Sequence, residues 1–259
     1  MIDWKRFRIN AVFKNRLIGG VPADPKLIEG WLKANMPNVQ EAALEKLAAT
    51  TLKEVAATVE EESKPMWTTF KRHEGNLIIE GRQLKAAFKE VANILRESLQ
   101  KNERSERSND AKDKKSRFTG LRAKLAERLF VEELQIPIID SKTLKPLTEP
   151  TGNEEEPIHV VTAQGPRTAL KKYDYCDGVR ISFTVRFLND GVVDEELLMT
   201  LMEYMSWNGI GASRSQGNGL LDSYEITRIG MDGKPWTPPA ALGDAEAEAG
   251  AALYKITKE

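Results

Sequence analysis

The chain has 259 residues, of which 41% are hydrophobic, and this is enough for one large domain that buries most of its surface on folding. Its 38 Lys and Arg residues balance 39 Asp and Glu residues, so the net charge of -1 excludes a whole-protein attraction to polyanions, and any nucleic-acid site must be local. A single cysteine, Cys176, excludes an internal disulfide, and the first residues offer no apolar stretch for a secretory signal or a membrane span. We therefore expect a cytoplasmic protein without membrane contact.

The chain begins with a strand pattern. Residues 4–14 alternate apolar with polar or basic side chains, which predicts a half-buried strand whose outer face is basic. Gly19 and Gly20 then predict a turn, and Asp24 before a proline is typical of a helix N-cap. Strand, glycine turn and helix start therefore lie close together in the sequence.

Two helical segments and one polar segment follow. Residues 39–63 are rich in Ala, Glu, Lys and Leu at roughly helical spacing, which predicts a helical insertion. A short strand at 76–80 leads into an amphipathic helix with an apolar stripe over 84–99. Residues 101–117 contain seven basic and four acidic residues and no apolar side chain larger than Ala. We expect them to form a mobile basic loop, either a plain linker or an arm that folds on a partner.

The second half of the chain has the clearest patterns. A Pro-, Thr- and Glu-rich connection precedes a short strand at 158–161, and residues 179–187 alternate through a whole strand with one apolar face. Asp194 then caps a helix that ends at Asn208, and a final strand covers 220–229.

The order of these elements predicts the fold class. Strand, helix, strand followed by strand, helix, strand is the split βαβ order, so we expect an α+β fold with a ferredoxin-like (RRM-like) core. A doubly wound sheet is disfavoured, because only two helices separate convincing strands at the usual crossover lengths. The expected domain is a single one at 1–230 with insertions at about 36–73 and 101–157, followed by an acidic, Ala-rich tail at 231–259.

A glycine-rich loop joins the last helix to the last strand. Glycine permits positive φ and close approach of the backbone to a ligand, and the loop adds a guanidinium and two hydroxyls suited to phosphate oxygens. The loop enters a strand, whereas the glycines of a nucleotide-binding fingerprint precede a helix. A turn that merely needs glycine is the alternative. The loop residues that we expect to contact a nucleic-acid backbone are Gly209, Gly211, Ser213, Arg214, Ser215, Gly217 and Gly219.

Three segments of the chain resemble the RAMP superfamily, which contains RNA-binding subunits and guide-RNA-processing nucleases of CRISPR systems. Residues 209–219 are similar to the family's glycine-rich loop between its last helix and last strand. Residues 79–88 resemble the segment Pro-Gly-Ser-Ser-Leu-Lys-Gly-Ala-Leu-Arg of its backbone subunits, although Glu80 replaces the proline and Ala86 replaces a glycine. A glycine pair at 19–20 follows the first strand.

The resemblance implies a ferredoxin-like RAMP core that binds single-stranded RNA. It also implies assembly as a homo-oligomer or a ribonucleoprotein complex, with copies side by side along the RNA. In its overall pattern the chain also resembles stand-alone phage-encoded proteins as much as members of CRISPR operons.

Basic residues outside the glycine-rich loop are further candidates for RNA contact. The segment 164–173 places three cations and a tyrosine after a glycine turn, so we interpret 165–172 as a second RNA-facing loop. For each cation the alternative is an ordinary solvated side chain. These candidates are Arg82, Lys85, Arg8, Lys14, Arg167, Lys171 and Lys172.

The sequence does not predict an enzyme. Its two histidines, His73 and His159, are far apart, and one cysteine adds no metal-ligand spacing, so we expect neither a metal nor another cofactor. Asp24 is the third catalytic candidate, because some backbone subunits of the RAMP superfamily cut RNA through an aspartate in an early loop. Helix capping accounts for Asp24 without catalysis.

Three functional hypotheses remain. The leading one is a non-catalytic RAMP-like protein that cradles single-stranded RNA with the glycine-rich loop, the basic face of the first strand and the 165–172 segment. The second is a metal-independent endoribonuclease of the same fold. The third is a phage protein-interaction module that acts on a host complex through the acidic tail or the 101–117 segment.

Overall fold

The structure is a computed structural model. It describes residues 3–22, 67–106, 115–162, 165–236 and 253–257. The expected Asp24 helix and the helical insertion at 39–63 lie outside these residues. In the part that is described, no helix is long and apolar enough to cross a membrane.

The largest sheet has six strands in the order β14-β13-β1-β12-β7, with β9 also paired to β12. Each of its pairings is antiparallel. Its strands are β1 Trp4–Phe13, β7 Leu129–Val131, β9 Ile139–Asp140, β12 Val179–Leu188, β13 Leu221–Ile229 and β14 Leu253–Thr257. The alternation in the sequence explains β1 and β12, whose apolar residues face one side of the sheet and are buried. Phe7 and Phe187 stack there with ring centroids 5.6 Å apart.

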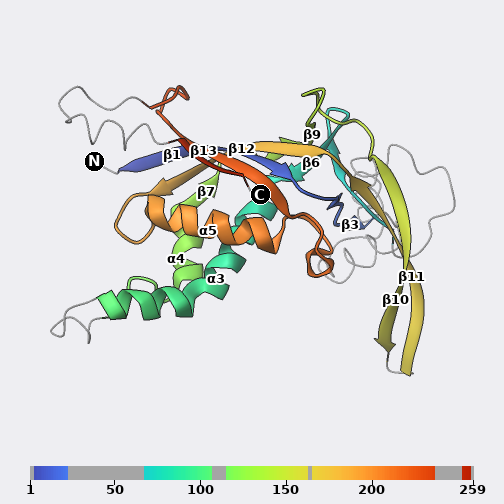
Figure 1. The fold of residues 1–259 in the computed structure, drawn as a ribbon, viewed down its shortest axis with the longest axis horizontal. Helices are drawn as coiled ribbons and strands as arrows, with labels where there is room; N and C mark the ends of the chain where they lie inside the picture. The colour runs from blue at the N-terminus through green and yellow to red at the C-terminus, as the bar shows by residue number, and fades with distance from the viewer. Residues whose placement is uncertain (1–2, 23–66, 107–114, 163–164, 237–252, 258–259) are drawn as a thin grey trace, which may run out of the picture.

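Three helices of the described chain cover one face of this sheet (Figure 1). They are α3 Gly81–Glu106, α4 Leu121–Arg128 and α5 Glu195–Asn208. The expected apolar stripe of α3 is buried at Leu84, Phe88 and Val91. Asp194 caps α5 as expected, because its side chain accepts a hydrogen bond of 2.9 Å from the amide of Leu197.

The polar segment at 101–117 differs in part from the expectation. α3 continues through Glu106, so the first residues of the expected mobile loop are helical. On the other side of the segment, the Ser116 hydroxyl donates a hydrogen bond to the Glu103 carboxylate. Residues 107–114 lie outside the described part.

A second sheet is built on a long hairpin that projects from the body of the molecule (Figure 1). Its strand order is β10-β11-β4-β3, and β2 also pairs with β11. The hairpin strands are paired over their whole shared length, which spans roughly 35 Å at the usual rise. The strands are β2 Leu17–Ile18, β3 Val21–Pro22, β4 Thr68–Thr69, β10 Gly152–Thr162 and β11 Gly165–Cys176.

The hairpin corrects the interpretation of 165–172 as a loop, because these residues belong to β11. Opposite charges explain the pairing: Glu155 lies opposite Lys172, and Glu156 lies opposite Lys171. β10 also contains Pro157, which an edge strand tolerates.

A third, smaller sheet corrects the expected role of the strand at 76–80. It has the order β5-β6-β8, with β5 Lys71–His73, β6 Asn76–Glu80 and β8 Gln135–Pro137. β6 has the expected bounds, but it pairs with β5 and β8 and is not a strand of the six-stranded sheet. The strand that follows α3 and α4 in the six-stranded sheet is β7. The chain therefore has a mixed α+β fold.

Candidate functional site

The fold brings the three segments singled out in the sequence to one cleft of about 310 Å³. The cleft lies between the turn after β2, the first turns of α3 and the glycine-rich loop, which are distant in the sequence. The residues that define it are Gly19, Gly20, Gln83, Ala86, Gly211 and Arg214.

The glycine-rich loop is closed on itself and attached to β2 and the residue before it. The Ile210 amide donates to the Gly219 carbonyl at 2.9 Å, which closes the base of the loop. The Ala212 amide donates to the Ile18 carbonyl at 3.1 Å, and the Gly219 amide donates to the Arg16 carbonyl at 2.8 Å. These bonds hold the loop backbone in a fixed place beside β2.

Two glycines of the site are required by internal packing. A Cβ at Gly219, where φ is +73°, would lie 1.9 Å from the Ile210 carbonyl oxygen. A Cβ at Gly19 would lie 2.3 Å from the Thr69 carbonyl carbon. Neither position accepts a side chain without a backbone shift, so the close backbone packing of the loop and of the turn accounts for these two glycines.

The tip of the loop presents backbone amides. Ser213 has a left-handed φ of 54°, and Arg214–Gln216 form one 3-10 turn. The Gln216 amide donates to the Ser213 carbonyl, and the amides that begin such a turn have no partner inside it. Ser215 lines the outer side of this tip with Arg214.

Arg214 already has a partner on α3. Its guanidinium donates a 2.9 Å hydrogen bond to the Glu90 carboxylate. Both side chains are partly exposed, so the ion pair contributes only about 0–1 kcal/mol. The Arg214 guanidinium can therefore leave Glu90 at little cost.

The candidates at the start of α3 point elsewhere. Arg82 is mostly exposed and donates to Glu80 at 2.7 Å. The Lys85 ammonium lies 4.2 Å from the centroid of the Phe130 ring, and partial burial, aided by the charge of Lys89, lowers the pKa of Lys85. Neither Arg82 nor Lys85 lines the cleft.

The two hairpin candidates Lys171 and Lys172 contact different parts of the structure, because adjacent residues of a strand face opposite sides. Lys171 reaches the glycine-rich loop, where its ammonium donates to the Ser213 hydroxyl at 3.1 Å. The Lys172 ammonium instead lies 4.5 Å from the centroid of the Trp67 ring. Tyr173 is buried, and this burial, followed by its 2.7 Å hydrogen bond to Glu156, raises the pKa of its hydroxyl. The side chain of Arg167 lies outside the described part.

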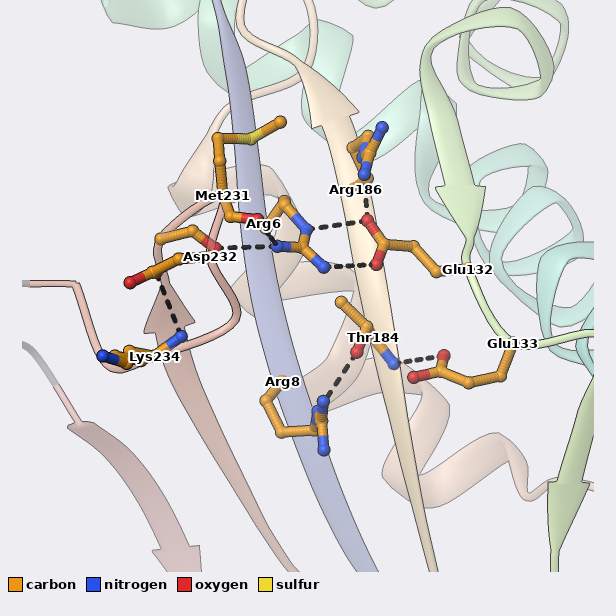
Figure 2. A network of polar contacts seen from close by, with 10 residues as sticks. Arg6, Arg8, Glu132, Glu133, Thr184, Arg186, Met231, Asp232 and Lys234 are labelled. Atoms are coloured by element: carbon orange, nitrogen blue, oxygen red, sulfur yellow. Dashed lines mark hydrogen bonds and ion pairs between the residues drawn. The ribbon is translucent and has the colours of Figure 1, made fainter.

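The outer face of the six-stranded sheet carries a separate cluster (Figure 2). Arg6 and Arg186 share the Glu132 carboxylate, with hydrogen bonds of 2.6–2.8 Å. These bonds, that from Arg6 above all, lower the pKa of Glu132. Arg8 is exposed and donates to the Thr184 hydroxyl at 3.1 Å. The basic face of β1 is thus partly neutralised.

Lys14 and the catalytic candidates lie in different surroundings. Lys14 is exposed just after β1, and its amide donates to the Leu220 carbonyl at 2.8 Å. His73 is exposed, with its Nε2 3.9 Å from the Glu74 carboxylate. Asp24 and the side chain of His159 lie outside the described residues. Within those residues, no three His, Cys, Asp or Glu side chains are grouped to hold a metal ion.

Sequence reasoning missed two residues of this region, Glu90 and Trp207. Trp207 is 65% exposed and, with Glu90, Ser213 and Arg214, lines a second hollow of about 520 Å³ on the outer side of the loop. A signal for Trp207 was present, because it falls outside the apolar row of α5 that includes Leu201. No such signal marks Glu90, because its contact with Arg214 depends on how α3 packs.

No protein-family model and no curated protein matches the sequence. Two chains of CRISPR complexes are among the solved structures that are similar to this one. One belongs to a type III-B Cmr-beta complex bound to cognate target RNA, with a TM-score of 0.40 and 15% identity, covering 86% of this chain and 60% of that chain. The other belongs to a type IV-B CRISPR complex, with a TM-score of 0.39 and 10% identity, covering 94% of this chain and 99% of that chain. The chain thus spans 60% of the length of the first.

Proposed function

We propose that this chain is a RAMP-like protein that binds single-stranded RNA in the cleft beside its glycine-rich loop. The observation that carries the proposal is the convergence of the turn at 19–20, the start of α3 and the loop at 209–219 on one cleft. These are the three segments in which the sequence resembles the RAMP superfamily. A chance resemblance gives no reason for such convergence.

The arrangement of the six-stranded sheet supports a ferredoxin-like core. Four neighbouring strands have the order β13-β1-β12-β7, and α3 with α4 and α5 precede β7 and β13 respectively. β1 and β7 are both antiparallel to β12, and β12 and β13 are both antiparallel to β1, so each helical connection joins parallel strands. This is the order of two interleaved βαβ units with their helices on one face (Figure 1).

In this proposal a phosphate group of the RNA takes the place of Glu90 on Arg214. The guanidinium offers paired donors to phosphate oxygens, and the amides of 213–215 with the Ser213 hydroxyl add further donors. Lys171, already 3.1 Å from Ser213, places a second cation beside the same tip. Such contacts are made to the sugar-phosphate backbone of the RNA and do not distinguish one base sequence from another. Binding is therefore salt-dependent and weakly sequence-selective.

The test is binding of a labelled single-stranded RNA, with matched single-stranded DNA as competitor, at two salt concentrations. Arg214→Ala should weaken binding about tenfold or more and reduce the salt slope by about 0.7, the value of one lost single-strand phosphate contact. Arg96→Ala is the matched control, since Arg96 is a partly exposed arginine of α3 that pairs with Glu97 and does not line the cleft. It should bind as the wild type does.

Other outcomes of the same experiment separate the alternatives. Wild-type protein that binds no RNA contradicts the proposal and favours the protein-interaction module. Cleavage of the labelled RNA without added metal favours the endoribonuclease, and its dependence on Asp24, His73 or His159 can then be measured. Side-by-side assembly of copies along the RNA, which the resemblance implies, should appear as cooperative binding to longer strands.

A further inference from the structure

Trp207 is an exposed aromatic residue at the edge of the glycine-rich loop. It is the penultimate residue of α5 and directly precedes the turn into the loop. Its 65% exposure is one of the largest among the apolar side chains of the described chain. An indole with this much exposed surface presents apolar area that a ligand can cover.

The hollow beside Trp207 joins the proposed RNA cleft. Glu90, Gly211 and Arg214 line both the hollow of about 520 Å³ and the cleft of about 310 Å³. A ligand that contacts Arg214 from the cleft therefore lies next to the hollow. The exposed ring and the guanidinium are within reach of a single bound strand.

The remaining lining of the hollow is polar. It consists of Asn208, Ser213 and Ser215 with Ala212 and the glycine backbone. The Nδ2 of Asn208 is a buried donor without a hydrogen-bond partner among the described residues. A protein contact surface centres on an apolar anchor within further apolar packing, which this lining does not supply.

We propose that Trp207 stacks on a nucleobase of the single strand whose phosphate contacts Arg214. An aromatic ring beside a cation is the arrangement that binds one nucleotide by its base and its backbone together. Stacking on an indole accepts every base, so it adds affinity without strong sequence preference. This inference rests on the proposed function and adds to it: the ligand must carry an unstacked base, so a single strand binds and a duplex binds much more weakly.

The experiment compares wild-type protein, Trp207→Ala and Trp207→Phe with two probes of equal length. One probe is a single-stranded oligouridine, and the other is its abasic counterpart, which keeps ribose and phosphate. Trp207→Ala should weaken binding of the oligouridine about 5- to 100-fold and leave binding of the abasic probe unchanged. Trp207→Phe should lie between wild type and Trp207→Ala. Thermal unfolding of both variants is measured alongside, so that a loss of binding can be separated from a loss of folded protein.

The other outcomes overturn the inference in distinguishable ways. Equal binding of the oligouridine by wild type and Trp207→Ala, or an equal loss with both probes, removes the stacking role and leaves the RNA cleft in place. Unchanged RNA binding with a lower sedimentation mass for Trp207→Ala assigns the residue to contacts between protein chains. Wild-type protein that binds neither probe overturns the proposed function together with this inference.

Discussion

Replacing Glu132 by Gln removes the charge that two arginines share on the outer face of the sheet (Figure 2). The carboxylate accepts two hydrogen bonds from Arg6 and one from Arg186, at 2.6–2.8 Å. Breaking a buried pair costs about 3–5 kcal/mol, and breaking an exposed pair costs about 0–1 kcal/mol. Arg6 and Glu132 are 13% and 22% exposed, so we expect an intermediate loss of about 2 kcal/mol.

The loss should depend on pH in a defined direction. The folded pKa of Glu132 is lowered below its ordinary value of 4.5, first by the hydrogen bond from Arg6. Its contribution to stability is therefore fully present above the unfolded pKa and is lost as the pH falls through the folded pKa. The difference in unfolding free energy between wild type and Glu132→Gln should be largest near neutral pH and should shrink on acidification.

Urea unfolding at about pH 7 and about pH 3 measures both quantities. Arg186→Gln is the internal comparison and should cost less than Glu132→Gln, because Arg186 is 36% exposed and makes one of the bonds. Arg96→Gln, at a surface pair, should change stability by less than about 0.5 kcal/mol. A Glu132→Gln protein as stable as wild type at neutral pH, or an equal loss at both pH values, would refute the reasoning.

Three other variants test the site and the core. Glu90→Gln should raise RNA affinity up to about fivefold, because Arg214 no longer leaves an ion pair, and lower affinity in the same binding assay would contradict this. Gly219→Ala should destabilise the fold by more than about 1 kcal/mol, since its Cβ meets the Ile210 carbonyl at positive φ, and an unchanged melting temperature by circular dichroism speaks against the loop geometry. Phe88→Ala should lower the free energy of unfolding in urea by about 3–5 kcal/mol, because the ring is fully buried. A loss below about 1 kcal/mol would contradict the packing of α3 against the sheet.

The sequence predicted those elements whose burial pattern is local. β12 and α5 have periodic apolar residues over their whole length, and the Asp194 cap and the end of α5 at Asn208 were confirmed. β1 and β6 were also found within a residue of their expected bounds. In β1, β12 and α5, the apolar face is buried and the other face is less buried, so the pattern along the chain reports the packing directly.

Elements that depend on a distant partner could not be predicted in the same way. β11 contains Pro166 and lacks alternation, and it is a strand because Lys171 and Lys172 lie opposite the acidic residues of β10. β6 joins its own small sheet, since β5 and β8 flank it. A strand pattern gives no information about which strand will be its neighbour.

The candidate site shows the same division. The glycine-rich loop was located from composition, and its place in a cleft with Gly19 and Gly20 is a property of the fold. Which of the candidate cations lie near the loop also depends on the tertiary structure. Arg82 was a candidate from its place at the helix start and Lys85 from the family resemblance, yet they contact Glu80 and Phe130, whereas Lys171 reaches the loop tip.

The most direct test of the central claim is hydrogen–deuterium exchange of the full chain, with and without a saturating single-stranded RNA. We expect slower exchange in the presence of RNA at the loop tip, residues 211–215, and at the turn, residues 18–21, because these backbones line the cleft. Exchange in α4, whose residues line neither the cleft nor the hollow beside Trp207, should stay the same. RNA-dependent protection that leaves both cleft segments unchanged would contradict the claim that the glycine-rich loop holds the RNA.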